Sequence, residues 1–222
     1  MRPIPVIAID GPSASGKGTV AQGVAQALGF HYLDSGAIYR VLGLAAVRAG
    51  INLENESEIL YILMKSKVNF ISNNIFLNTC EVSEAIREEA ISSAASQVSA
   101  HAQVRLALLA RQREFRRPPG LVADGRDMGS VVFTDSILKI YLTASAEARA
   151  KRRYKQLIDK GLDANMTDLL QGIKLRDQRD SERVVAPLQK CPDAIEVDST
   201  DLSVAQAIAH VLRHHKAISD HP

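Results

Sequence analysis

The chain contains no tryptophan, and aromatic residues of all kinds make up only 5% of its 222 residues. This scarcity disfavours a protein that binds nucleic acid by stacking bases on aromatic rings. The net charge at pH 7 is only +2, so no overall charge attracts the chain to a polyanion or a membrane surface. We therefore expect neither nucleic acid nor a membrane among its partners.

Cysteine is equally scarce. Cys80 and Cys191 have no metal-ligand spacing around them, so a disulfide framework and a zinc site are both disfavoured. The first residues show no signal-peptide pattern, and no apolar run approaches the ~20 residues that span a bilayer. A reduced, cytoplasmic protein is the simplest expectation.

The N-terminal region carries the clearest motif. An apolar run over residues 6–9 predicts a buried strand, which leads through a glycine-rich loop into helix-forming sequence. This order is the context of a P-loop, whose backbone N–H groups, helix N-terminus and lysine bind the phosphates of a nucleoside triphosphate. A turn without a ligand is the alternative, which the lysine disfavours. The predicted loop comprises Gly11, Pro12, Ser13, Ala14, Ser15, Gly16, Lys17, Gly18 and Thr19.

One position departs from the strict P-loop pattern. Gly18 stands directly after Lys17, where the pattern has serine or threonine, and Thr19 follows. Direct ligation of Mg²⁺ by a hydroxyl group is therefore disfavoured, and contact through water is favoured. The Gly-Lys-Gly-Thr ending resembles nucleoside monophosphate kinases rather than GTPases or motor ATPases.

Periodicity and turn residues predict the elements of the N-terminal half. They are a helix over 17–28, a strand over 30–33, a helix over 34–48, a helix over 51–66, a β-hairpin over 68–78 and helical sequence over 83–117 with a break near 99–102. The helix over 51–66 has Ile59, Leu60, Leu63 and Met64 as its apolar stripe. The hairpin turns at Asn73 and Asn74, and it interrupts the helix–strand alternation, so we expect it outside the main sheet.

The C-terminal half continues the alternation. Its predicted elements are strands over 121–124, 137–142 and 194–198, a helix over 145–161, a helix from Thr167 or Asp168 to 183, and a last helix opened by a capping box of Ser203 and Gln206. The apolar stripe of that last helix is Val204, Ala207, Ile208, Val211 and Leu212. Together the elements predict an α/β sandwich with a parallel five-stranded sheet.

Charged residues follow the predicted strands, where α/β proteins bind ligands. Asp124 ends its strand as a Walker-B carboxylate does, beside a metal ion or its waters, and Arg126 and Asp127 follow at once. The stretch from Asp34 to Arg40 also follows a strand. A helix cap with one surface arginine is the alternative interpretation of that stretch.

A second group of arginines shares one helix face, because Arg176, Arg179, Asp180 and Arg183 lie at i, i+3, i+4 and i+7. The face is either solvated and ion-paired or part of a mobile lid. Arginines at site positions without a well-placed histidine fit transfer between two phosphate groups. A phosphate acceptor needs no general base, since its second pKa of ~6 leaves it a dianion at pH 7. The local signals leave the acceptor open.

Five segments together resemble the bacterial-type cytidylate kinases, and the resemblance covers nearly the whole chain. They are DGPS with GKGT (10–19), DSGAIYR (34–40), AASQV (94–98), ADGRDMG (123–129) and RVVAPL (183–188). The resemblance implies a monomer that transfers the γ-phosphoryl of ATP to CMP or dCMP with Mg²⁺. It also implies a core of 1–34, 118–154 and 184–222, a CMP-binding region of 35–117 that includes an insertion at 65–100, and a helical lid of 155–183.

The resemblance assigns roles to single residues as well. Ser96, Arg105 and Asp127 should line the cytosine pocket, where a carboxylate accepts from the N4 amino group and an arginine donates to N3 and O2. Uracil presents the opposite groups and should be rejected. The full CMP-binding set is Ser35, Arg40, Ser96, Arg105, Arg126, Asp127, Asp180 and Arg183. The catalytic set is Lys17, Arg126, Arg176 and Arg179, with Arg152 on the ATP side and Asp124 near Mg²⁺ through water.

Two other functions are weighed against this one. A P-loop kinase could act on another small acceptor, such as shikimate or AMP. A nucleotide-binding switch or regulator is also conceivable, but the arginine-bearing lid and the missing hydroxyl after Lys17 disfavour it.

Overall fold

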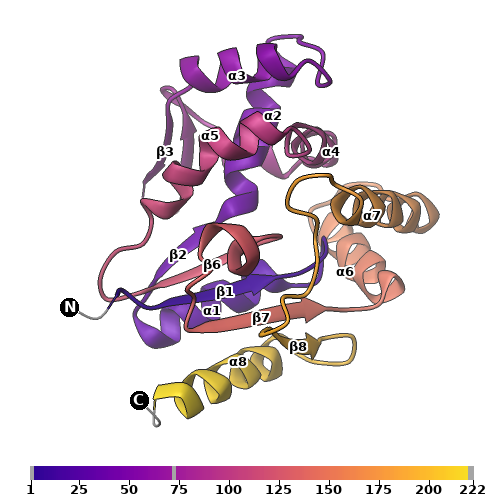
Figure 1. Cartoon of the computed structure of the whole chain (residues 1–222). Coiled ribbons are helices and arrows are strands. Elements are labelled where there is room, and N and C mark those ends of the chain that lie inside the picture. The colour runs from indigo at the N-terminus through magenta and orange to yellow at the C-terminus, as the bar shows by residue number, and fades with distance from the viewer. Residues whose placement is uncertain (1–2, 72–73, 220–222) are drawn as a thin grey trace. The chain divides into compact units, whose positions relative to one another are not determined.

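The structure, a computed structural model, describes residues 3–71 and 74–219 (Figure 1). By its contacts the chain divides into two compact units. We call residues 1–33 with 113–222 the core unit, and residues 34–112 the inserted unit. The three-part division into core, CMP-binding region and lid stays a prediction.

The main sheet is parallel and five-stranded, as predicted, with the order β2-β6-β1-β7-β8. Its strands are β1 (Val6–Asp10), β2 (His31–Asp34), β6 (Leu121–Gly125), β7 (Leu138–Thr143) and β8 (Ile195–Asp198). All five residues of β1 are buried, which explains its continuous apolar run, because strands covered on both faces do not alternate. The register pairs Ile9 with Asp124, so the ends of β1 and β6 meet at one edge.

Two helices share a hydrophobic core with the sheet (Figure 1). They are α1 (Lys17–Leu28), which has the predicted bounds and ends at Gly29 in a left-handed conformation, and α8 (Val204–Ser219). The predicted capping box is present, since Ser203 N donates to Gln206 Oε1 at 2.9 Å and Gln206 N to Ser203 Oγ at 3.3 Å. Val204 does not belong to the core stripe and is 49% exposed. It lies in the first turn of α8, ahead of the residues that pack on α1.

The helices α6 (Ala146–Ile158) and α7 (Met166–Ser181) pack against each other. Ser145 caps α6 as predicted, because its Oγ accepts from Ala148 N at 3.2 Å. The predicted start of α7 at Thr167 or Asp168 is wrong, since the side chain of Asn165 is the cap that accepts from both of their N–H groups. A π-helical turn, η2 (Met128–Val132), follows β6.

The inserted unit is built from helices and a small antiparallel sheet. Its elements are α2 (Ser35–Arg48), α3 (Glu56–Lys65), β3 (Val68–Ile71), β4 (Asn74–Leu77), β5 (Cys80–Glu81), η1 (Ala85–Arg87), α4 (Glu89–Val98) and α5 (Ala102–Arg113). The predicted hairpin is β3 paired with β4, outside the main sheet, and β5 adds an unpredicted third strand. Asn73 of the predicted turn lies outside the described residues.

Two predictions for the helices of the inserted unit are wrong in part. Only Ile59 of the predicted stripe on α3 is buried, and Met64 is 76% exposed. The helix begins after its cap at Asn55, and the residue that joins Ile59 on its inner side is Ile62, which packs partly buried against the core of the inserted unit. The predicted break near 99–102 is present between α4 and α5, but residues 83–88 form only the turn η1, and α5 ends at Arg113.

Candidate functional site

The predicted phosphate-binding loop joins the end of β1 to the start of α1. A β-carbon on Gly11 would lie 2.0 Å from the backbone oxygen of Leu142 in β7, so the loop leaves the sheet where only glycine fits. Gly16 is the N-cap of α1, with a φ of 88°. The first N–H groups of α1 therefore begin directly after the loop, which is the arrangement that binds anions at helix N-termini.

Two side chains of the loop have the chemistry to bind a phosphate. Lys17 is buried, and its Nζ donates to Pro12 O at 3.1 Å, so the ammonium group lies over the loop itself. The hydroxyl of Ser15 is buried and has no hydrogen-bond partner among the described residues. A buried hydroxyl without a partner is costly, and a phosphate oxygen could accept from it.

The predicted Walker-B carboxylate lies close to the loop. A β-carbon on Gly18 would be 3.9 Å from Oδ2 of Asp124, which is only 4% exposed. Within residues 3–71 and 74–219, no three His, Cys, Asp or Glu side chains are grouped to hold a metal ion. A carboxylate beside a phosphate loop fits a hydrated Mg²⁺ carried by the nucleotide, because Mg²⁺ keeps several waters and binds through one or two carboxylates.

Asp10 was not predicted as a site residue, but its side chain connects the end of β1, where the loop begins, to η2. Its two carboxylate oxygens accept from Met128 N and Gly129 N, both at 2.8 Å. Burial raises the pKa of Asp10 to about 6, although these two N–H groups and Lys17 act to lower it. An acidic residue at the end of a strand was the only available signal.

The core unit brings three predicted site residues together. Arg126 Nε donates to Asp180 Oδ2 at 2.7 Å, and Arg183 lies 2.9 Å from Asp180 Oδ1. Burial acts to raise the pKa of Asp180, but the two guanidinium groups outweigh it and hold that pKa below its ordinary value. Asp180 and Arg183 are both buried, so a solvated helix face does not describe them. Arg176 and Arg179 lie on α7 and are half-buried, whereas Arg183 lies beyond the end of that helix at Ser181.

Arg149 and Arg152 of α6 attach the loop to its surroundings. Arg149 donates to Ser13 O at 3.0 Å and makes two hydrogen bonds to the carboxylate of Asp177 on α7. Arg152 donates to Ser15 O at 3.2 Å and to both the hydroxyl and the carbonyl of Ser199. The predicted ATP contact of Arg152 stays a prediction. The attachments made by Arg149 were not predicted, because they join residues far apart in the sequence.

In the inserted unit, the start of α2 holds an ion pair. Asp34 caps the helix by accepting from Ala37 N at 2.9 Å, and Arg40 donates to its other oxygen at 2.5 Å. A β-carbon on Gly36 would lie 2.9 Å from the guanidinium group of Arg40, so glycine leaves room for the pair. Ser35, also predicted as a site residue, is buried in the first turn of this helix.

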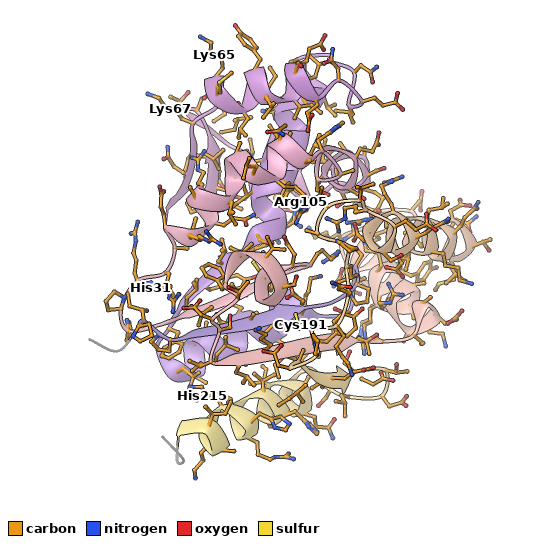
Figure 2. All side chains as sticks on the ribbon, in the orientation of Figure 1. His31, Lys65, Lys67, Arg105, Cys191 and His215 are labelled. Atoms are coloured by element: carbon orange, nitrogen blue, oxygen red, sulfur yellow. The ribbon has the colours of Figure 1, made fainter. Side chains whose placement is uncertain are left out.

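A second polar group in the inserted unit lies at the break between α4 and α5. Arg105, labelled on α5 in Figure 2, is buried, donates to Ser99 O at 3.1 Å and stacks 5.6 Å from the ring centroid of Tyr39. Ser99 in turn donates to Ser96 O at 3.0 Å. The hydroxyl of Ser96 is buried without a hydrogen-bond partner among the described residues. The structure thus brings the predicted pair of Ser96 and Arg105 together, with one unsatisfied buried hydroxyl.

Comparison with known proteins agrees with these features. The model of the family described as cytidylate kinase matches residues 7–217. The chain is 51% identical to the cytidylate kinase of Nitrosomonas europaea, covering 94% of each chain. It is 54% identical to that of Polynucleobacter asymbioticus and 55% identical to that of Cupriavidus necator, covering 96% of both chains in each case.

Proposed function

This chain belongs to the cytidylate kinase family and is a phosphotransferase that uses ATP to phosphorylate CMP or dCMP, and we propose roles for its individual residues in that reaction. The observation that carries the proposal is the loop of Gly11–Thr19 with buried Lys17 and Asp124 beside it. These residues bind the triphosphate of ATP through backbone N–H groups, the ammonium group and the start of α1.

Transfer to CMP needs no general base, since the acceptor phosphate is itself a nucleophilic dianion at pH 7. The protein must instead hold two anionic groups together and stabilise the charge that spreads over the moving phosphoryl group. Lys17, Arg126, Arg176 and Arg179 serve this purpose. Asp124 would hold the waters of a Mg²⁺ ion bound to the ATP phosphates, and such an ion would neutralise further charge there.

The choice of base rests on polar groups that cytosine satisfies and uracil does not. Arg105 donates to N3 and O2, and Ser96 supplies the hydroxyl that lacks a partner within the described residues. Asp127, buried in the core unit, accepts from the N4 amino group. Uracil would place a carbonyl against the carboxylate and an N–H against the arginine. Arg40 and Arg126 bind the CMP phosphate, with Ser35 beside Arg40, and Asp180 with Arg183 bind the sugar.

The cellular location and the quaternary state of the enzyme are the remaining parts of the proposal. Within the described ranges, no helix combines the length and apolar character that crossing a membrane requires. We propose a monomeric cytoplasmic enzyme whose partners are its small-molecule substrates.

An acceptor screen tests the proposed function. ATP and Mg²⁺ are mixed with CMP, dCMP, UMP, AMP or shikimate, and ADP release is followed by a coupled assay. CMP and dCMP should be phosphorylated well and UMP poorly, and Lys17→Met should abolish transfer. Comparable turnover of UMP and CMP would contradict the specificity.

Arg105→Met tests the base-reading residue. Loss of a hydrogen bond from a charged donor costs about 1.5–3 kcal/mol, so kcat/KM for CMP should fall about ten- to hundredfold while that for UMP changes little. The matched control is Arg111→Met, on the same helix, whose guanidinium group donates to Val68 O. A control that loses as much discrimination between CMP and UMP as Arg105→Met would refute the assignment.

A further inference from the structure

The carboxylate of Asp124 is held by a tyrosine of the neighbouring strand. Tyr32 lies on β2, next to β6 in the sheet, and its hydroxyl donates to Asp124 Oδ1 at 2.7 Å. The ring is half-buried against the core formed by α1 and the sheet. Such a charge-assisted hydrogen bond is short and fixes the orientation of the acceptor.

The same hydroxyl lies beside the position where the P-loop lacks one. A β-carbon on Gly18 would be 3.4 Å from Tyr32 Oη, 3.9 Å from Asp124 Oδ2 and 4.0 Å from Asp124 Oδ1. These are ordinary van der Waals distances, so Gly18, Tyr32 and Asp124 enclose one small region. A serine or threonine side chain after Lys17 would point into this region.

We propose that Tyr32 is a positioning residue that supplies, from β2, the hydroxyl group missing from the P-loop. By holding one oxygen of Asp124, it sets the orientation in which the carboxylate accepts hydrogen bonds from the waters of nucleotide-bound Mg²⁺. The inference rests on the proposed role of Asp124 in the reaction. Tyr32 itself contacts neither substrate, because it acts through Asp124.

Calorimetric titration of ATP in the presence and absence of Mg²⁺ gives a readout that does not depend on turnover. The quantity measured is the factor by which Mg²⁺ tightens ATP binding. Tyr32→Phe keeps the ring and removes only the hydroxyl, so it should reduce this factor about three- to tenfold and leave the affinity for metal-free ATP unchanged. An unchanged factor, or an equal loss with and without Mg²⁺, would overturn the proposal.

Two double variants separate the hydroxyl from the packing around it. In Tyr32→Phe with Gly18→Ser, the new hydroxyl lies within reach of Asp124 and should restore most of the Mg²⁺-dependent gain. In Tyr32→Phe with Gly18→Ala, the same β-carbon is present without a hydroxyl, and no recovery is expected. Equal behaviour of the two double variants would overturn the proposal.

Asp124→Asn distinguishes failure of this inference from failure of the role on which it rests. If Asp124→Asn leaves the Mg²⁺-dependent gain unchanged, the proposed role of the carboxylate is wrong and the inference falls with it. If Asp124→Asn abolishes the gain while Tyr32→Phe retains it, only the inference about Tyr32 is overturned.

Discussion

Asp10 couples the stability of the core unit to pH. Its carboxylate is buried, and it accepts from the backbone of η2 at Met128 and Gly129. Burial raises its pKa from the ordinary 3.8 to about 6, so the native state binds this proton more tightly than the unfolded state. Between these pH values the native state holds more protons. The free energy of unfolding therefore falls as pH rises through this window.

The size of the effect follows from the two pKa values. At 1.36 kcal/mol for each pKa unit, a rise from 3.8 to about 6 corresponds to about 3 kcal/mol. The contribution is fully present below pH 3.8 and is lost by the time the pH passes 6. Asp10→Asn cannot titrate, and the hydrogen bond that it loses to η2 costs the same at every pH.

Urea denaturation of the natural chain and of Asp10→Asn from pH 4 to pH 7 measures the difference. The free energy of unfolding of the natural chain, minus that of the variant, should fall by about 2–3 kcal/mol over this range. The control is Asp135→Asn. A hydrogen bond from Arg116 lowers the pKa of Asp135, so its difference curve should stay level from pH 5 to pH 7. A level or rising curve for Asp10→Asn would refute the reasoning.

Two further substitutions test the packing of the site. Gly11→Ala places a β-carbon 2.0 Å from a backbone oxygen of β7 and should lower the free energy of unfolding by at least about 1–3 kcal/mol. The control is Gly172→Ala, whose β-carbon meets nothing within 4 Å and should not lower the free energy of unfolding. Equal urea midpoints for the two variants would contradict the expectation. Asp180→Asn leaves the buried Arg183 and the half-buried Arg126 without their counter-charge and should cost about 3–5 kcal/mol at pH 7. Because the pKa of Asp180 is lowered, this deficit should shrink when the pH falls below 3.8, and a deficit independent of pH would count against the ion pair.

The strands and the phosphate loop could be predicted because their signals are local. The apolar run of β1, the glycines of the loop and the stop at Gly29 each act within a few residues, and α1 has the predicted bounds. The predicted start of a helix was wrong where several residues could each serve as its N-cap. Asn165 caps α7 ahead of Thr167 and Asp168, since its side-chain oxygen reaches both N–H groups.

The contacts that organise the site could not be predicted, because they depend on the order of strands in the sheet. Tyr32 and Asp124 are 92 positions apart, and Asp10 and Met128 are 118 apart. They meet because β6 lies between β2 and β1. Alternating helices and strands indicate a parallel sheet but leave that order open. The acidic strand ends could therefore be recognised as candidate site residues, but their partners Tyr32 and Met128 could not.

The arginines of α7 and of the residues just after it could not be interpreted from their spacing alone. The predicted helix reaches residue 183, but α7 ends at Ser181, so Arg183 lies outside it. The i, i+3, i+4, i+7 pattern fits a solvated, ion-paired surface as well as a buried network. The structure contains the buried network, because Arg126, 54 positions away in the sequence, binds Asp180 and supplies a second counter-charge besides Arg183. With one arginine the burial of this carboxylate would be costly, whereas two guanidinium groups satisfy both of its oxygens. The burial of Asp180 therefore depends on a residue that follows β6 as well as on the segment that displays the pattern.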